Sequence, residues 1–159
     1  MTKTGKKYEL QVRNIFDQIV NHDFQGVQNI NVQHDIKIKG KSGNKHQVDV
    51  YWEFYFADAK HCAIIEVKDK SRPVPKLDME SFVFRLQDIP GQPRGYFVSK
   101  NGFQSGAENL ARQNDIKIMT LNKPDEEFWH GKMRNLEIHN TLQIPRVKNF
   151  TTRVDKKWI

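Results

Sequence analysis

The residues best suited to chemistry in this sequence are two carboxylates and a lysine that accompany apolar segments. Glu66 and Lys68 lie two residues apart at the end of the apolar run 62–67, and Asp49 belongs to an earlier segment in which apolar and polar residues alternate. Side chains alternate along a β-strand, so Glu66 and Lys68 are expected on the same face. Charged groups at the end of a buried strand destabilise the fold unless they are paired or bind a metal. This combination therefore predicts a site.

Two carboxylates beside a lysine suit the chemistry of a hard divalent cation. Mg²⁺ prefers oxygen ligands, typically one or two carboxylates, with water and substrate phosphate completing the shell. A neighbouring lysine can orient the attacking water and stabilise charge that develops on phosphorus. Lys68 is expected to offset part of the repulsion between Asp49 and Glu66, but one lysine cannot neutralise both. The alternative, in which Asp49 is an exposed strand acid and Lys68 its ion-pair partner, stays open at this point.

The periodicity of apolar residues predicts the elements that position these groups. The expected elements are a helix at 6–21, strands at 31–39, 47–56 and 62–68, a helix after Pro75 that ends before Pro90-Gly91, a strand at 96–98, a helix from about Ser105 and a strand at 116–119. An antiparallel meander followed by a β-α-β-α-β series implies an α/β sandwich with a mixed sheet.

Two local details follow from the same patterns. Strict alternation in the predicted hairpin places Val48 and Val50 on one face and Asp49 on the other, with Val32 and Ile36 likewise sharing a face. For the helix that follows the turn at 102–104, Ser105 is the expected N-cap residue.

Length, charge and cysteine content limit the class of protein. A chain of 159 residues with 37% hydrophobic residues is expected to fold as one domain. The single cysteine, Cys62, suits a reducing compartment, and no apolar run approaches a membrane span, so we expect a cytoplasmic protein without a membrane segment. His22, His34 and His46 recur every twelve residues but show no zinc spacing, and we assign them no role.

The C-terminal part of the chain differs in character from the rest. Residues 1–122 contain the expected helices and strands, whereas 123–159 are polar with short β-like pieces and a basic end. We therefore expect a core at 1–122 and an extension of unassigned role at 123–159.

The order of the acidic and basic residues resembles a known superfamily. Asp49 followed by Glu66-Val67-Lys68 is similar to the motif of the PD-(D/E)xK nucleases, which share the restriction-endonuclease-like fold. Arg94–Ser99 followed by Phe103-x-Ser-x-Ala-x-x-x-Ala111 resembles the Mrr-type branch of restriction endonucleases. Val48 stands where the motif's name has a proline. The likeness covers roughly residues 6–121.

This resemblance implies a role for each site residue. Asp49 and Glu66 would be metal ligands, with the main-chain carbonyl of Val67 as a third, and Lys68 would assist the nucleophile. A glutamate on the first helix, here Glu9, would hold a metal-bound water or a second ion; the alternative for Glu9 is an ordinary solvated helix charge. The implied cofactor is Mg²⁺, for which Mn²⁺ would substitute, and the implied fold is an α/β/α sandwich with helices on both faces of a mixed sheet.

The function that the resemblance implies is hydrolysis of DNA phosphodiester bonds by a magnesium-dependent endonuclease of a restriction, defence or repair type. The alternative is a catalytically silent nucleic-acid-binding module with the same fold. A net charge of +7 favours a polyanionic partner in either case. Cleavage of both DNA strands would require a homodimer or sequential nicks. The lysines that could bind phosphates, or be merely solvated, are Lys3, Lys6, Lys7, Lys37, Lys39, Lys41 and Lys45.

Overall fold

The computed structural model describes residues 3–23, 30–56 and 59–122, and it confirms the expected order of elements. These elements are α1 (Lys3–Asp23), β1 (Gln33–Lys39), β2 (Lys45–Phe56), β3 (Ala59–Lys68), α2 (Lys76–Asp88), β4 (Arg94–Ser99), α3 (Ser105–Gln113) and β5 (Lys117–Thr120). The predicted extension at 123–159 lies outside the described residues. No helix in the described part of the chain combines the length and apolar character needed to cross a membrane.

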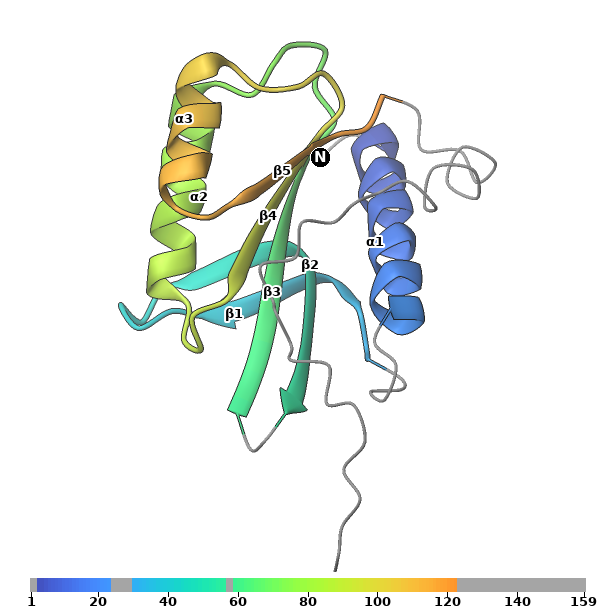
Figure 1. The fold of residues 1–159 in the computed structure, drawn as a ribbon, viewed down its shortest axis with the longest axis vertical. Helices are drawn as coiled ribbons and strands as arrows, with labels where there is room; N and C mark the ends of the chain where they lie inside the picture. The colour runs from blue at the N-terminus through green and yellow to red at the C-terminus, as the bar shows by residue number, and fades with distance from the viewer. Residues whose placement is uncertain (1–2, 24–29, 57–58, 123–159) are drawn as a thin grey trace, which may run out of the picture.

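The strands form a mixed sheet in the order β1-β2-β3-β4-β5. β1, β2 and β3 pair antiparallel, whereas β3, β4 and β5 pair parallel because α2 and α3 carry the chain back between them. Figure 1 shows α1 on one side of the sheet and α2 with α3 on the other. The predicted fold class is therefore confirmed: an α/β/α sandwich whose mixed sheet starts with an antiparallel meander.

A hydrophobic core lies on each face of the sheet, and β3 contributes to both. Ile65 and Val67 pack in the cluster that includes α1, and Cys62 and Ile64 pack in the cluster that includes α2 and α3. A strand that is covered on both faces needs apolar side chains in both directions, which is why its sequence is continuously apolar. The prediction of a strand buried on both sides is confirmed.

The predicted alternation of the β1–β2 hairpin is wrong at its middle. Val48 packs with the α2 and α3 cluster and Val50 with the α1 cluster, although they are two residues apart. The same change separates Val32, which directly precedes β1, from Ile36 within β1. Asp35, which lies between them, has a φ of 54° and is absent from the paired positions of β1. A single residue with left-handed backbone angles exchanges the faces to which the side chains on either side of it point. Because both faces of the sheet carry apolar residues, the alternation in the sequence does not reveal this exchange.

The start of α3 also differs from the prediction. Ser105 is the first helical residue, and the N-cap is Gln104, whose side chain makes no capping hydrogen bond. The preceding loop is held instead by Val74, whose N–H donates to the carbonyl of Gly102 and whose carbonyl accepts from the N–H of Gln104, both at 2.9 Å. This short bridge ties the loop after β3 to the loop after β4, and it fixes the end of the sheet at which Lys68 lies.

Candidate active site

Asp49 lies at the end of the ladder between β2 and β3. β2 pairs with β1 on both sides of Asp49, whereas the ladder to β3 begins only at the pair Val50–Ile65. Just before that pair the strands separate, and Asp49 Oδ2 accepts a hydrogen bond from the backbone N–H of Val67 at 2.8 Å. A buried N–H needs an acceptor, so the carboxylate replaces the ladder partner that the divergence removes. Asp49 is therefore fixed beside the residue that follows Glu66.

Glu66 is held between two cations. Its side chain is on the same face as Lys68, as predicted, and its Oε1 lies 2.7 Å from Lys68 Nζ. Its Oε2 lies 2.7 Å from Nη2 of Arg85, which comes from α2. Only 4% of Glu66 is exposed, so both ion pairs are shielded from solvent on the carboxylate side. The sequence predicted that Glu66 and Lys68 share a face, and it did not indicate Arg85.

Arg85 is a site residue that periodicity alone could have indicated. It lies one helical turn after Phe82, which is fully buried, and so it is directed toward the sheet. Its guanidinium carbon lies 5.6 Å from the centre of the Phe82 ring, and Nη1 donates to the carbonyl of Gln47 at 3.2 Å. The sequence signal for Arg85 was its position at the edge of the apolar stripe of a helix that packs on the sheet.

Glu9 approaches the same region from α1. It is 4% exposed, so the alternative that treats it as a solvated helix charge is wrong. Its Oε2 lies 3.2 Å from Nε2 of His34, and His34 pairs across the sheet with Val50, the neighbour of Asp49. The sequence gave His34 no role, because the regular spacing of three histidines says nothing about which of them faces α1.

Burial and like charge shift the acid equilibria of this cluster. The pKa of Asp49 is raised from 3.8 to about 7, first by burial, next by Glu66 and to a lesser extent by Glu9, while the Val67 N–H and Lys68 act in the opposite direction. Burial alone would lower the pKa of Lys68, but Glu66 and Asp49 outweigh it and raise the pKa. Asp49 is 8% exposed, so the alternative of an exposed strand acid is also wrong.

The carboxylate oxygens of the site are ligands of the type that a divalent cation prefers. Among the described residues, no group of three or more His, Cys, Asp or Glu side chains is close enough to hold a metal by itself. Mg²⁺, however, commonly uses one or two carboxylates and completes its shell with water and phosphate. Asp49 and Glu66 supply two such carboxylates, and burial followed by the charge of Glu66 raises the pKa of Asp49. A site of two carboxylates is the arrangement that fits.

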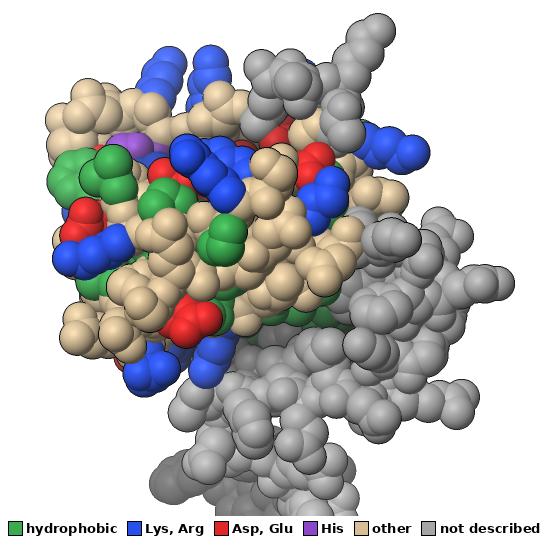
Figure 2. Space-filling model, turned by 90° about the horizontal axis from the view of Figure 1, so that it is seen from above, with side chains coloured by type: hydrophobic (Ala, Val, Ile, Leu, Met, Phe, Trp, Pro, Cys, Tyr) green, Lys and Arg blue, Asp and Glu red, His purple; other side chains and the backbone are tan. Residues whose placement is uncertain are grey.

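The described surface carries many exposed basic side chains. Of the lysines predicted to contact phosphates, the ones whose side chains are described are exposed, namely Lys6, Lys7, Lys37, Lys39, Lys41 and Lys45. Figure 2 looks onto the end of the molecule where β3 and β4 finish, and it shows Lys and Arg side chains spread over that end with Asp and Glu among them. Some of the local lysines are paired, as in Lys100 with Asp69 at 2.8 Å. A polyanion would therefore meet both free and paired cations.

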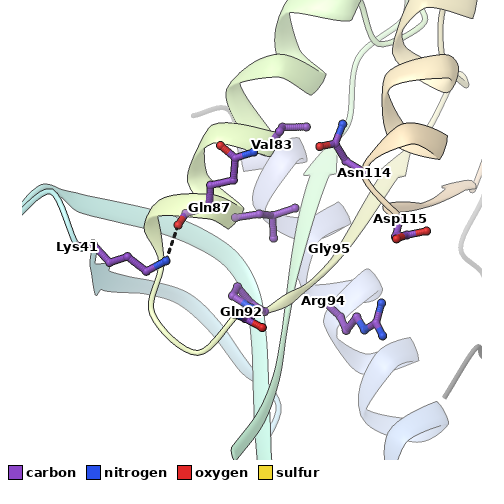
Figure 3. Close-up of a pocket in the computed structure, with 10 residues that line it drawn as sticks. Lys41, Val83, Gln87, Gln92, Arg94, Gly95, Asn114 and Asp115 are labelled. Atoms are coloured by element: carbon purple, nitrogen blue, oxygen red, sulfur yellow. Dashed lines mark hydrogen bonds between the residues drawn. The ribbon is translucent and has the colours of Figure 1, made fainter.

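A separate pocket of about 630 Å³ lies at the opposite end of β4 (Figure 3). Arg94 and Gly95 line it at the start of that strand, and Lys41 Nζ donates to the carbonyl of Gln87 at 2.8 Å along its edge. None of the candidate site residues lines this pocket. The paired carboxylates, and not the pocket, are the candidate active site.

Comparisons with known proteins support the fold. No family model matches the sequence, and no curated protein matches it. Can2 from Sulfobacillus thermosulfidooxidans, solved with cyclic tetra-adenylate, aligns with a TM-score of 0.56 and 16% identity over 82% of this chain and 35% of that one. AF1548, a protein of unknown function, aligns with a TM-score of 0.51 and 12% identity over 70% of this chain and 56% of that one.

A repair endonuclease from Pyrococcus abyssi aligns with a TM-score of 0.46 and 20% identity over 74% of this chain and 47% of that one. The chain spans 35% and 56% of the two structures that align better. At these identities the likeness supports the fold alone, namely the α/β/α sandwich with a mixed sheet that the sequence predicted.

Proposed function

We propose that this protein is a divalent-metal-dependent endonuclease that hydrolyses DNA phosphodiester bonds, of the Mrr type within the PD-(D/E)xK nucleases. The observation that carries the proposal is the pair of buried carboxylates, Asp49 and Glu66, beside Lys68 at the point where β2 and β3 separate. Burying two like charges together is unfavourable unless a cation joins them.

The proposed roles of the residues come from the resemblance to the PD-(D/E)xK nucleases. Asp49, Glu66 and the main-chain carbonyl of Val67 would hold Mg²⁺ or Mn²⁺, which supplies a more acidic water and neutralises charge on the phosphate. Lys68 would orient the attacking water and stabilise the charge that develops on phosphorus. Glu9, supported by His34 at 3.2 Å, would accept a hydrogen bond from a water in the site. Each of these groups is fixed by a strand or helix, which is what positioning of reacting groups requires.

DNA is the proposed substrate because the charge of the protein complements it. The chain carries a net charge of +7, and many of its lysines are exposed. A catalytically silent nucleic-acid-binding module is the second candidate. It is favoured by one observation, namely that both oxygens of Glu66 are already bound by cations.

Incubation of supercoiled plasmid DNA with Mg²⁺, with Mn²⁺ and with EDTA tests the proposal. We expect nicking or cutting with either metal and none with EDTA. Asp49→Ala and Lys68→Ala should each lower the rate by roughly 10²-fold or more, because each removes a charge used at the reacting phosphate. Asp115→Asn, which changes an exposed carboxylate elsewhere, is the matched control.

Two outcomes would contradict the proposal that this protein is a nuclease. Site variants as active as the wild type would show that the cleavage comes from another source. Binding to DNA without cleavage under any metal condition would support the silent module instead.

A further inference from the structure

Arg85 is positioned more firmly than a surface arginine. It contacts Glu66 Oε2 at 2.7 Å and the carbonyl of Gln47 at 3.2 Å, and its guanidinium lies over the ring of Phe82. Its side chain is 22% exposed, compared with 61% for Lys76 on the same helix. The guanidinium is thus part of the candidate site and is fixed from three directions.

With Arg85 counted, the charges of the site nearly balance. When both are ionised, Asp49 and Glu66 contribute two negative charges, and Lys68 and Arg85 contribute two positive ones; Glu9 adds a further carboxylate at the edge of the cluster. A divalent cation that enters alone is repelled by two neighbouring cations, one of which cannot lose its charge because it is a guanidinium. A phosphodiester that enters with the metal supplies the missing negative charge. Metal and DNA should therefore bind better together than separately.

We propose that Arg85 is a positioning residue that compensates the charge of Glu66 and thereby makes metal binding depend on the presence of a phosphodiester. This inference rests on the proposed nuclease function and adds the order in which its components assemble. Because coupling between two ligands is reciprocal, the metal should strengthen DNA binding by the same factor as DNA strengthens metal binding.

The two cations differ in how they can respond. Lys68 has a flexible stem and contacts Oε1, so it can turn toward an incoming phosphate and free that oxygen. Arg85 is anchored by Gln47 and Phe82 and keeps Oε2 in place. A carboxylate ligand is commonly oriented by such a hydrogen bond to its other oxygen. Arg85 thus both orients Glu66 and opposes the binding of metal alone.

Calorimetric titration of the full chain with Ca²⁺, with and without a short DNA duplex and at fixed ionic strength, tests the proposal. In the wild type, the duplex should tighten Ca²⁺ binding by about tenfold or more. Arg85→Gln should bind Ca²⁺ alone about tenfold more tightly than the wild type and gain correspondingly less from the duplex. Arg94→Gln, which removes the same charge from an exposed position at the other end of the sheet, should behave as the wild type.

The outcomes separate this inference from the function on which it rests. Arg85→Gln with Ca²⁺ affinity equal to or below that of the wild type would overturn the role of Arg85, even if the wild type cleaves DNA. A wild type that binds no Ca²⁺ in either condition would overturn the nuclease proposal and this inference together. If Arg85→Gln does not fold, Arg85→Lys is measured instead. Because this variant keeps the positive charge, its Ca²⁺ affinity must still depend on the DNA duplex, and loss of that dependence would overturn the proposal.

Discussion

Replacement of Asp49 by asparagine isolates the electrostatic strain in the candidate site. Asparagine keeps an oxygen that can accept the N–H of Val67 but carries no charge. The pKa of Asp49 is about 7 in the folded protein, against 3.8 for an ordinary aspartate, chiefly because of burial and then because of Glu66. The folded state therefore holds the proton more tightly than the unfolded chain. The stability that this proton contributes is fully present below pH ~4 and is lost as the pH rises through about 7.

The size of the effect follows from these two pKa values. A tenfold change in an acid dissociation constant corresponds to ~1.4 kcal/mol. Linkage then gives a loss of about 4 kcal/mol at pH 8 and about 1.7 kcal/mol at pH 5, relative to the protonated protein. Because asparagine does not titrate, the difference in unfolding free energy between Asp49→Asn and the wild type should be about 2–3 kcal/mol larger, in favour of the variant, at pH 8 than at pH 5. For a chain of this size, that difference is roughly 5–10 °C in Tm.

Thermal unfolding followed by circular dichroism at pH 5 and pH 8, in EDTA and at fixed ionic strength, measures this difference. Asp115→Asn is the matched control, since it makes the same chemical change at an exposed residue whose φ of 54° asparagine also adopts. We expect its Tm to follow the wild type at both pH values. An Asp49→Asn variant whose advantage is the same at both pH values, or whose Tm is below that of the wild type at pH 8, would refute the reasoning.

Three further predictions address the other charges. Glu66→Gln leaves Lys68 and Arg85 without their shared carboxylate, so urea unfolding should show a loss of about 2–4 kcal/mol, and a gain would contradict the ion pairs. Asp88 hydrogen-bonds to His46 at 2.6 Å, which together with its other partners lowers the pKa of Asp88 to about 2. The stability that Asp88 contributes is present above pH ~4 and lost as the pH falls through about 2. The difference in urea midpoint between wild type and Asp88→Asn should therefore shrink from pH 5 to pH 2. A difference that stays constant would contradict this prediction. If about five phosphates are neutralised, log K for duplex DNA should fall with log[salt] with a slope of about −4 to −5, and a flat plot would remove DNA as the partner.

Local pattern was sufficient for much of the fold and for part of the site. The continuous apolar run of β3 predicted a strand covered on both faces, and its period of two placed Glu66 and Lys68 together. The hairpin pattern placed Asp49 on the neighbouring strand, where the β2–β3 ladder confirms it. These inferences succeed because hydrophobic period and turn composition are properties of residues close in the chain.

Other features were decided only when the elements packed. Strict alternation could not show that β1 reverses its faces at Asp35, because both faces of the sheet are covered by apolar clusters and both directions therefore carry apolar residues. The partners of two site carboxylates, Arg85 for Glu66 and His34 for Glu9, come from other elements. By itself the sequence determined which residues can do chemistry and which strands carry them. The tertiary structure decided which cations neutralise them, because contacts between distant segments depend on which face each helix covers and in which register.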